Sequence, residues 1–349
     1  MKFSSPVVFI FLFLFFAVRI SFAQEHRHED RIVCIGFYNL ENLFDTINDP
    51  NKNDEEFLPD GANHYTGKIY LDKLHKLASV IALIGADASD DGLSILGCAE
   101  IENRHVLEDL VKQKEIRGRD YEIVHYESPD ERGVDVGLLY NPKNFQPLFS
   151  ESLFIPLKNN DGTPRYTRDV LYVYGKLKGE PVHIFVNHRP SRRGGEEASA
   201  PYRAITAGVC RHKIDSLFAV NKSSRIILMG DLNDDPVNES VTLVLKATGN
   251  RKQLKDGKLF NPWLKLYKAG IGSLAYQDSW NLFDQIIISP ALLDTTLHQF
   301  HFKEALIFNR DFLINKTGRY KGYPKRTYDF NRYIGGYSDH FPTYIILEK

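Results

Sequence analysis

Short runs of apolar residues recur along the 349-residue chain, and polar segments rich in Gly, Pro, Asn and Asp separate them. Apolar runs of this length between turn-forming residues are typical of β-strands buried in a sheet. The pattern predicts strands at residues 31–38, 93–99, 121–126, 134–140, 146–154, 170–177, 182–186, 225–229, 283–288 and 341–347.

A wider apolar spacing predicts helices between these strands. Leu74, Leu77, Ile81 and Ile84 recur at the interval that places side chains on one side of a helix. From this spacing and from the length of the segments, helices are expected at residues 68–84, 102–114, 198–220 and 239–247. Residues 45–65 and 309–337 are polar or mixed in character and are expected to be loops.

The order of these elements predicts the fold class. Strands and helices are interspersed without regular βαβ alternation, and several strands are joined by short links, which favours antiparallel pairing. We therefore expect an α/β, four-layer αββα sandwich, in which two mixed, mainly antiparallel sheets pack face to face between outer helices. Residues 121–154 are expected to form a meander. No repeat or linker divides residues 24–349, which are expected to form a single domain.

The first 23 residues have the features of a secretory signal peptide. Lys2 supplies a positive charge, residues 7–18 are almost wholly apolar, and the small residues Ser21 and Ala23 precede a cleavage point before Gln24. The apolar run is shorter than the roughly 20 residues of a membrane-spanning helix. A secreted or periplasmic protein, without stable membrane association after cleavage, is therefore expected. An uncleaved anchor is the alternative.

Composition and charge exclude some classes of protein. With 43% hydrophobic and 26% charged residues, the chain falls in the globular range. The net charge of −1 becomes −3 once Lys2 and Arg19 are removed, which leaves 42 basic against 45 acidic residues. A generally cationic nucleic-acid binder is not indicated. The three cysteines include Cys34 and Cys98 in predicted core strands, and buried free thiols are expected.

Polar side chains gather where the apolar strands end or begin. Strand ends place side chains along one rim of a sheet, where sites are commonly built. The residues at such positions are Asn39, Glu41, Glu100, His188, Asp231, Asn233, Asp284, Asp339 and His340.

These residue types favour a hard divalent cation. Carboxylate and amide oxygens, without cysteine, are suited to Mg²⁺, with Mn²⁺ or Ca²⁺ as alternatives. Converging carboxylates repel one another unless a cation neutralises them, and such a cation can also stabilise charge on a reacting phosphoryl group.

The ordered set of these residues, including Gly230-Asp231-Leu232-Asn233 and Ser338-Asp339-His340, resembles the endonuclease/exonuclease/phosphatase superfamily. The resemblance spans residues 31–347 and implies a DNase I-like fold and a metal-dependent hydrolase of phosphate esters.

The resemblance also implies a role for each residue of the set. Glu100 would be the principal metal ligand, with Asn39 and Glu41 nearby and Asp339 on a second edge. Asp231 would orient or deprotonate the attacking water. The remaining catalytic residues implied in this way are Asn233, which would bind phosphate, His340 paired with Asp284, and His188 as a phosphate binder or general acid.

Basic and aromatic residues near the candidate site predict contacts with phosphate. Arg189 and Arg192 follow His188 directly, and Tyr166 with Arg168 resembles a stretch that contacts phosphate in the family. The basic, aromatic loop at residues 309–337 would suit either a polyanion or an ordinary flexible loop.

Three functions remain open at this point. The leading hypothesis is a secreted phosphodiesterase that cleaves nucleic acid by in-line attack of water. The first alternative is a phosphatase, or a phosphodiesterase of phospholipids or inositol phosphates, on the same fold. The second is a non-catalytic binding module. The exact substrate, endo or exo action and the oligomeric state do not follow from the sequence.

Overall fold

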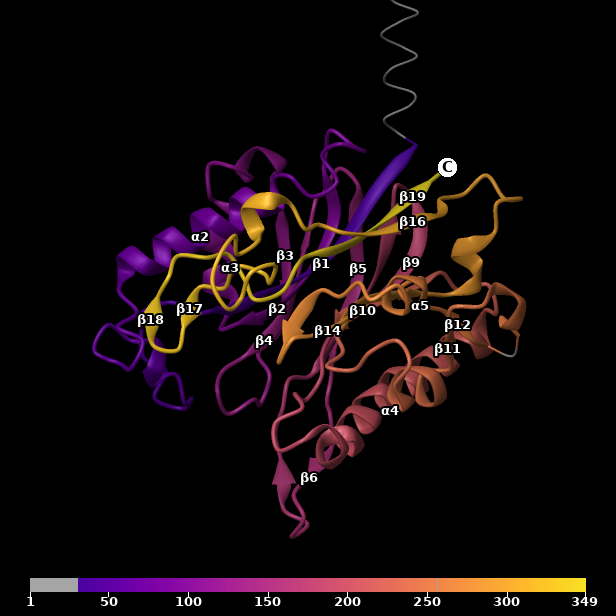
Figure 1. Cartoon of the computed structure of the whole chain (residues 1–349). Helices are drawn as coiled ribbons and strands as arrows, with labels where there is room; N and C mark the ends of the chain where they lie inside the picture. The colour runs from indigo at the N-terminus through magenta and orange to yellow at the C-terminus, as the bar shows by residue number, and fades with distance from the viewer. Residues whose placement is uncertain (1–30, 256) are drawn as a thin grey trace, which may run out of the picture.

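The computed structural model describes residues 31–255 and 257–349, and Figure 1 shows how their elements are arranged. The predicted signal peptide, residues 1–23, lies outside the described residues. Among the described residues, no helix combines the length and the apolar character needed to cross a membrane.

The first sheet has six strands in the order β16-β19-β1-β2-β4-β3. Only the central pair, β1 and β2, is parallel. The strands are β1 (Ile32–Leu43), β2 (Leu93–Ile101), β3 (Glu122–His125), β4 (Asp135–Tyr140), β16 (His301–Ile307) and β19 (Thr343–Glu348).

The second sheet has seven strands in the order β11-β12-β15-β10-β9-β8-β5. Here β9 and β10 are parallel at the centre, and the short β11 and β12 are parallel at one edge. The strands are β5 (Phe145–Leu153), β8 (Val170–Leu177), β9 (Glu180–His188), β10 (Ile226–Asp231), β11 (Ala247–Thr248), β12 (Leu259–Phe260) and β15 (Asp284–Ile288).

Three two-stranded ribbons project from the sandwich. Their pairs are β6 (Leu157–Lys158) with β7 (Pro164–Arg165), β13 (Leu274–Tyr276) with β14 (Ser279–Asn281), and β17 (Tyr328–Asp329) with β18 (Arg332–Tyr333).

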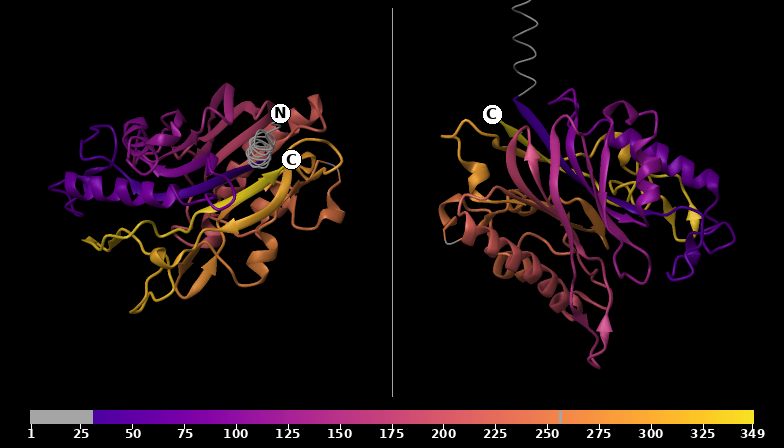
Figure 2. Two further views of the ribbon diagram at one scale, coloured as in Figure 1. Left: turned by 90° about the horizontal axis from the view of Figure 1, so that it is seen from above. Right: turned by 180° about the vertical axis from the view of Figure 1, so that it is seen from behind.

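Helices cover the outer faces of the two sheets. Helices α2 (Gly67–Ile81) and α3 (Arg104–Val111) pack on the first sheet, and α4 (Glu196–Val220) packs on the second, on the opposite side of the molecule (Figures 1 and 2). The short α5 (Leu264–Lys268) lies between β12 and β13. A third apolar core fills the space between the sheets. The predicted αββα sandwich of two mixed, mainly antiparallel sheets is confirmed.

The structure differs from the predicted elements in several places, among them the short strands β17 and β18 inside the predicted loop at residues 309–337. The expected meander is wrong, because β3 and β4 pair in the first sheet whereas β5 pairs with β8 in the second. Strand β16 was not predicted, because its half-buried sequence lacks a continuous apolar run. The helix expected at residues 239–247 is a single π-helical turn, Ser240–Val244.

The cysteines behave as expected from their positions. Cys34, Cys98 and Cys210 are buried free thiols, and none pairs with another.

Candidate active site

The predicted site residues converge because the central strands of both sheets end at the same rim. In the second sheet Asp231 lies opposite His188 on one neighbouring strand and opposite Asp284 on the other. In the first sheet Asn39 of β1 lies opposite Ala99, directly before Glu100. Face-to-face packing then brings Asn39 within hydrogen-bond distance of Asp231 in the other sheet.

Irregular backbone aims the side chains at this rim. The pairing of β1 with β2 shifts register between Asn39 and Leu43, and β2 shifts against β4 around Glu100. Glu41, Asn42 and Glu100 have left-handed backbone conformations, with φ angles of 50°, 53° and 58°. Such bulges redirect side chains and are common beside active sites. Here they turn Glu100 toward β1, where its Oε2 accepts a hydrogen bond from the Asn42 N–H at 3.0 Å.

Asn39 connects the two sheets through its side-chain amide. Its Nδ2 donates to Glu100 Oε1 and to Asp231 Oδ2, both at 3.1 Å, and its Oδ1 accepts from the Glu41 N–H at 2.9 Å. The side chain is fully buried. The carboxylates of Glu100 and Asp231 repel each other, and the Asn39 amide holds them side by side.

His188 completes a first cluster with these carboxylates. Its Nε2 lies 3.7 Å from Glu100 Oε1 and 3.8 Å from Asp231 Oδ2. Burial, with a further contribution from Arg168, lowers the pKa of His188 well below its ordinary value. The ring is therefore neutral, and its buried Nδ1 has no hydrogen-bond partner among the described residues. Each of the three residues offers a ligand atom within 4.8 Å of the others, so the cluster fits a divalent cation.

A second cluster shares Asp231 with the first. Asp284 Oδ2 lies 2.7 Å from His340 Nδ1 and also accepts a hydrogen bond from the Ser273 hydroxyl. His340 Nε2 lies 3.9 Å from Asp231 Oδ2. Burial alone would lower the pKa of His340, but the adjacent Asp284 carboxylate outweighs it and raises this pKa well above the ordinary value. The Asp284 carboxylate therefore favours the imidazolium form of His340, whose Nε2 is on the side of Asp231.

Asp231 has an environment unlike that of an ordinary carboxylate. It is 2% exposed, and burial raises its pKa to about 7, although His340 opposes the shift. Asn233 follows in a left-handed conformation; its N–H donates to Asp231 Oδ1, and its Nδ2 donates to the Arg189 carbonyl. A carboxyl group with a pKa near neutrality can exchange a proton with water at physiological pH.

Glu41 and Asp339 lie beside the first cluster, and an arginine side chain pairs with both of them. The Arg326 guanidinium is 3.4 Å from Glu41 Oε1 and 3.3 Å from Asp339 Oδ2. Glu41 also accepts the Thr327 N–H at 2.7 Å. Arg326 thus pairs with both carboxylates, and metal binding by Glu41 and Asp339 stays a prediction. Asp339 is partly exposed and 4.0 Å from His340 Nε2.

The predicted phosphate-contacting residues divide into two groups. The Arg189 side chain is fully buried and donates to Ser240, and Arg192 is held by Glu196, Asp235 and Asn238. Arg192 therefore has internal partners, whereas Arg189 Nε and Nη2 are buried without a hydrogen-bond partner in the described chain, and phosphate binding by the two arginines stays a prediction.

Arg168 and Tyr166 have different positions. Arg168 pairs with Asp130 at 3.3 Å, donates to the Arg189 carbonyl at 2.7 Å, and is close enough to lower the pKa of His188. It remains a candidate phosphate contact at the site. Tyr166 is exposed on the loop after β7 and makes no hydrogen bond within the described chain.

Two cations near the site, Lys73 and Arg326, were not predicted as site residues. Lys73 lies on α2, is 1% exposed and donates to the Thr327 hydroxyl at 2.7 Å. Burial lowers its pKa, and the charges of Glu41, Asp339 and Glu100 oppose that shift. Arg326 comes from the long loop after β16. The basic character of the loop at residues 309–337 was a signal for Arg326, and the position of Lys73 next to Leu74 of the apolar helical stripe was the signal for Lys73.

Comparison with known proteins now defines the class. The chain belongs to the endonuclease/exonuclease/phosphatase family, whose model matches residues 34–349, and it is a hydrolase of phosphate esters. A search of curated proteins finds no significant match.

Solved structures show the same fold at low sequence identity. TDP2 of D. rerio, humanized by 14 mutations, is 15% identical with a TM-score of 0.55, covering 91% of this chain and 99% of that one. An endonuclease/exonuclease/phosphatase family protein of Bacteroides thetaiotaomicron is 17% identical with a TM-score of 0.52, covering 90% and 97%. A mannosyl-6-phosphatase of the same organism is 18% identical with a TM-score of 0.52, covering 91% and 100%.

Proposed function

We propose that the protein is an exported, Mg²⁺-dependent phosphoesterase that hydrolyses a small phosphate ester by attack of water. The observation that carries this proposal is the position of Asp231, whose carboxylate is shared by the two clusters. One cluster suits a cation, and the other supplies a positively charged histidine.

Glu100 would be the main ligand of the cation, with Asp339 on the open side. Asn39 would position the carboxylates instead of binding the metal, since its amide nitrogen faces them. A bound Mg²⁺ would supply charge stabilisation for the phosphoryl group. The cluster of carboxylate oxygens favours Mg²⁺ or Mn²⁺ over soft metals.

The other residues would prepare the water and bind the phosphate. Asp231, with a pKa of about 7, would accept a proton from the attacking water. His340, held as an imidazolium by Asp284, would donate a hydrogen bond from Nε2 to a phosphate oxygen. Neutral His188 and the second N–H of the Asn233 amide would bind the remaining oxygens.

The charges around the site favour a small ester over a long nucleic acid. Binding of a polyanion needs cations that are free to meet phosphates. In the loop at residues 309–337, however, acidic partners neutralise many of the basic side chains. The pairs are Arg310 with Asp87, Lys316 with Asp311, Arg326 with Glu41 and Asp339, and Arg332 with Asp329.

A nucleic-acid phosphodiester is the second candidate, and a group of aromatic rings supports it. Tyr323 contacts both Trp280 and Tyr320, Trp280 stacks on Phe341, and Arg319 lies over the Tyr320 ring. Such rings can stack on unpaired bases. One TDP2 structure of D. rerio with this fold is complexed with single-strand DNA product.

The proposal is tested on mature protein with p-nitrophenyl phosphate, bis-p-nitrophenyl phosphate, hexose phosphates, DNA and RNA. EDTA is expected to abolish hydrolysis, and Mg²⁺ or Mn²⁺ to restore it. Asp231→Ala should reduce kcat by about 10²–10⁴-fold. The control variant Asp311→Ala changes an exposed acid and should leave kcat unchanged. Full activity in EDTA, or in Asp231→Ala, would contradict the mechanism.

Export rests on the sequence of residues 1–23 alone. Sequencing of the exported protein should give an N-terminus at Gln24. Intact Met1 in a membrane fraction would instead support an anchor.

A further inference from the structure

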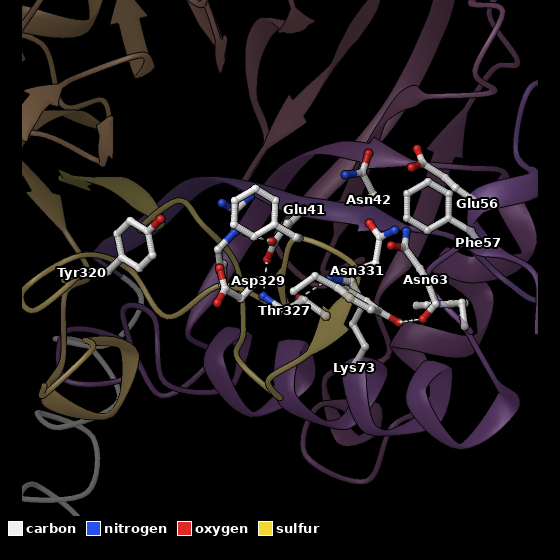
Figure 3. Close-up of a pocket in the computed structure, with 14 residues that line it drawn as sticks. Glu41, Asn42, Glu56, Phe57, Asn63, Lys73, Tyr320, Thr327, Asp329 and Asn331 are labelled. Atoms are coloured by element: carbon white, nitrogen blue, oxygen red, sulfur yellow. Dashed lines mark hydrogen bonds and ion pairs between the residues drawn. The ribbon is translucent and has the colours of Figure 1, made fainter. Parts of the chain in front are cut away.

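A pocket of about 320 Å³ lies beside Glu41 and Asn42, on the strand that carries Asn39 (Figure 3). Glu41 and Asn42 form its inner wall, Lys73 of α2 its floor, and residues of the loops around 56–65 and 320–331 its sides. The Asn42 N–H donates to Glu100, so one residue separates the pocket from the proposed metal-binding carboxylate. Its volume is at the lower end of the range of about 300–1,000 Å³ typical of small-molecule sites.

Several hydrogen-bonding groups of the pocket have no partner in the described chain. The side-chain amides of Asn42, Asn63 and Asn331 make no hydrogen bond within it. The Tyr65 hydroxyl is buried, its residue being 1% exposed, and is also unpartnered. An unpaired buried polar group costs about 1–3 kcal/mol. Among the described lining residues only the Tyr65 hydroxyl is such a buried group. The amides of Asn42, Asn63 and Asn331 are accessible and can bind a polar ligand.

The charge of the lining disfavours an anionic ligand. Glu41, Glu56 and Asp329 contribute three carboxylates, of which Asp329 pairs with Arg332, and Lys73 and Arg326 contribute two cations. Both cations already have partners, because Lys73 donates to Thr327 and Arg326 pairs with Glu41 and Asp339. A second phosphate or a carboxylate in the pocket would therefore be repelled.

Aromatic rings border the pocket. Phe57 and Tyr320 lie at opposite ends of it in Figure 3. The Phe330 ring, from the same loop as Tyr320, is 88% exposed. Aromatic rings in such positions pack against the C–H face of a ring while polar groups bind its edge.

We propose that this pocket binds a neutral ring with several hydroxyl groups, and that the substrate of the neighbouring site is therefore a sugar phosphate. A hydroxyl group both donates and accepts, which matches amides, a phenol and carboxylates together. This inference rests on the proposed function: the phosphate would lie at Glu100, Asp231 and His340, and the sugar would extend past Asn42 into the pocket.

The test compares hexose 6-phosphates with p-nitrophenyl phosphate, nucleoside 5′-monophosphates and a dinucleotide, all with Mg²⁺. Wild-type kcat/KM is expected to be highest for a hexose phosphate. Tyr65→Phe and Asn331→Ala should each lower the ratio of kcat/KM for hexose phosphate to that for p-nitrophenyl phosphate by about 3- to 10-fold, the effect of one hydrogen bond. Asn309→Ala, at an exposed asparagine outside the pocket, is the matched control and should leave this ratio unchanged.

Tyr65→Phe also separates this inference from a purely structural explanation. If the phenol were an unused buried group, its removal would raise the melting temperature and leave the substrate ratio unchanged, which would overturn the proposal. A wild-type preference for nucleotides, or an equal loss on both substrates in the variants, would overturn it as well.

Calorimetry keeps the inference distinct from the proposed function. Hexose 6-phosphate is titrated into the Asp231→Ala protein with Mg²⁺, with and without Tyr65→Phe. Weaker binding in the double variant supports the pocket even if no ester is hydrolysed, and in that case only the catalytic proposal fails. No binding of hexose phosphate overturns the pocket assignment, whatever the activity on p-nitrophenyl phosphate.

Discussion

Among the described residues, a group of histidine and carboxylate side chains lies at the catalytic rim and a similar group lies in the β3–β4 hairpin, but only the first has the properties of an active site. At the catalytic rim, Asp231, Asp284 and His340 approach one another within 4.8 Å. At the end of the β3–β4 hairpin, His125, Glu127 and Asp135 do the same. Residue identity and proximity therefore do not distinguish the clusters.

The hydrogen bonds distinguish them. In the hairpin cluster, Asp135 Oδ1 accepts from the Ser128 N–H and hydroxyl, and its Oδ2 lies 3.0 Å from His125 Nε2. In the catalytic cluster, Asp284 Oδ1 is buried without a partner in the described chain, and His340 Nε2 has its nearest acceptor, Asp231, only at 3.9 Å.

Chain connectivity also differs between the clusters. The three residues of the hairpin cluster come from one turn and its flanking strands, and they fix that turn locally. The catalytic residues come from β10, β15 and the segment before β19, and only the assembled sandwich brings them together. Unused hydrogen-bonding groups, held in place by segments far apart in the chain, therefore mark the functional cluster.

The largest expected difference between the clusters is in catalysis. His340→Ala should lower kcat by about 10²–10⁴-fold, because it removes the charged donor beside Asp231. His125→Ala, the matched change, should alter kcat by no more than a few fold. Steady-state kinetics of both variants measures kcat, and circular dichroism checks that both are folded. An equal fall in kcat in the two variants would show that the two clusters do not differ in catalysis.

A smaller effect is expected from combining changes in the catalytic pair. Asp284→Asn should lower kcat because His340 loses the carboxylate that keeps it charged. Adding His340→Ala to Asp284→Asn should then lower kcat only slightly further, since the two residues act as a unit. Kinetics of the two single variants and the double variant form the test, and additive losses would show that Asp284 has a separate role.

The smallest effect concerns stability. Asp135→Asn should lower the free energy of unfolding by about 1–3 kcal/mol, because it weakens the bonds of a buried carboxylate to Ser128 and His125. Activity per folded molecule should stay within a few fold of wild type. Urea unfolding measures the first quantity, and a fall in activity without a loss of stability would assign the hairpin cluster to catalysis.

The apolar pattern alone determined most of the fold. Runs such as Ile32–Leu43 and Ile226–Asp231 are strands because continuous apolar residues must be buried on both faces. The stripe in Gly67–Ile81 similarly required a helix that covers a sheet. The order of elements then sufficed for two sheets between helices, although it did not show that β5 leaves its sequence neighbours for the second sheet.

The sequence also located the rim of the site, since polar residues that end buried strands must lie at a sheet edge. Tertiary structure alone decided what each of them contacts. Glu41 pairs with Arg326 from a loop far along the chain, and Arg189 is fully buried with one bond to Ser240. Contacts between segments far apart in the chain depend on packing, and packing is a property of the whole fold.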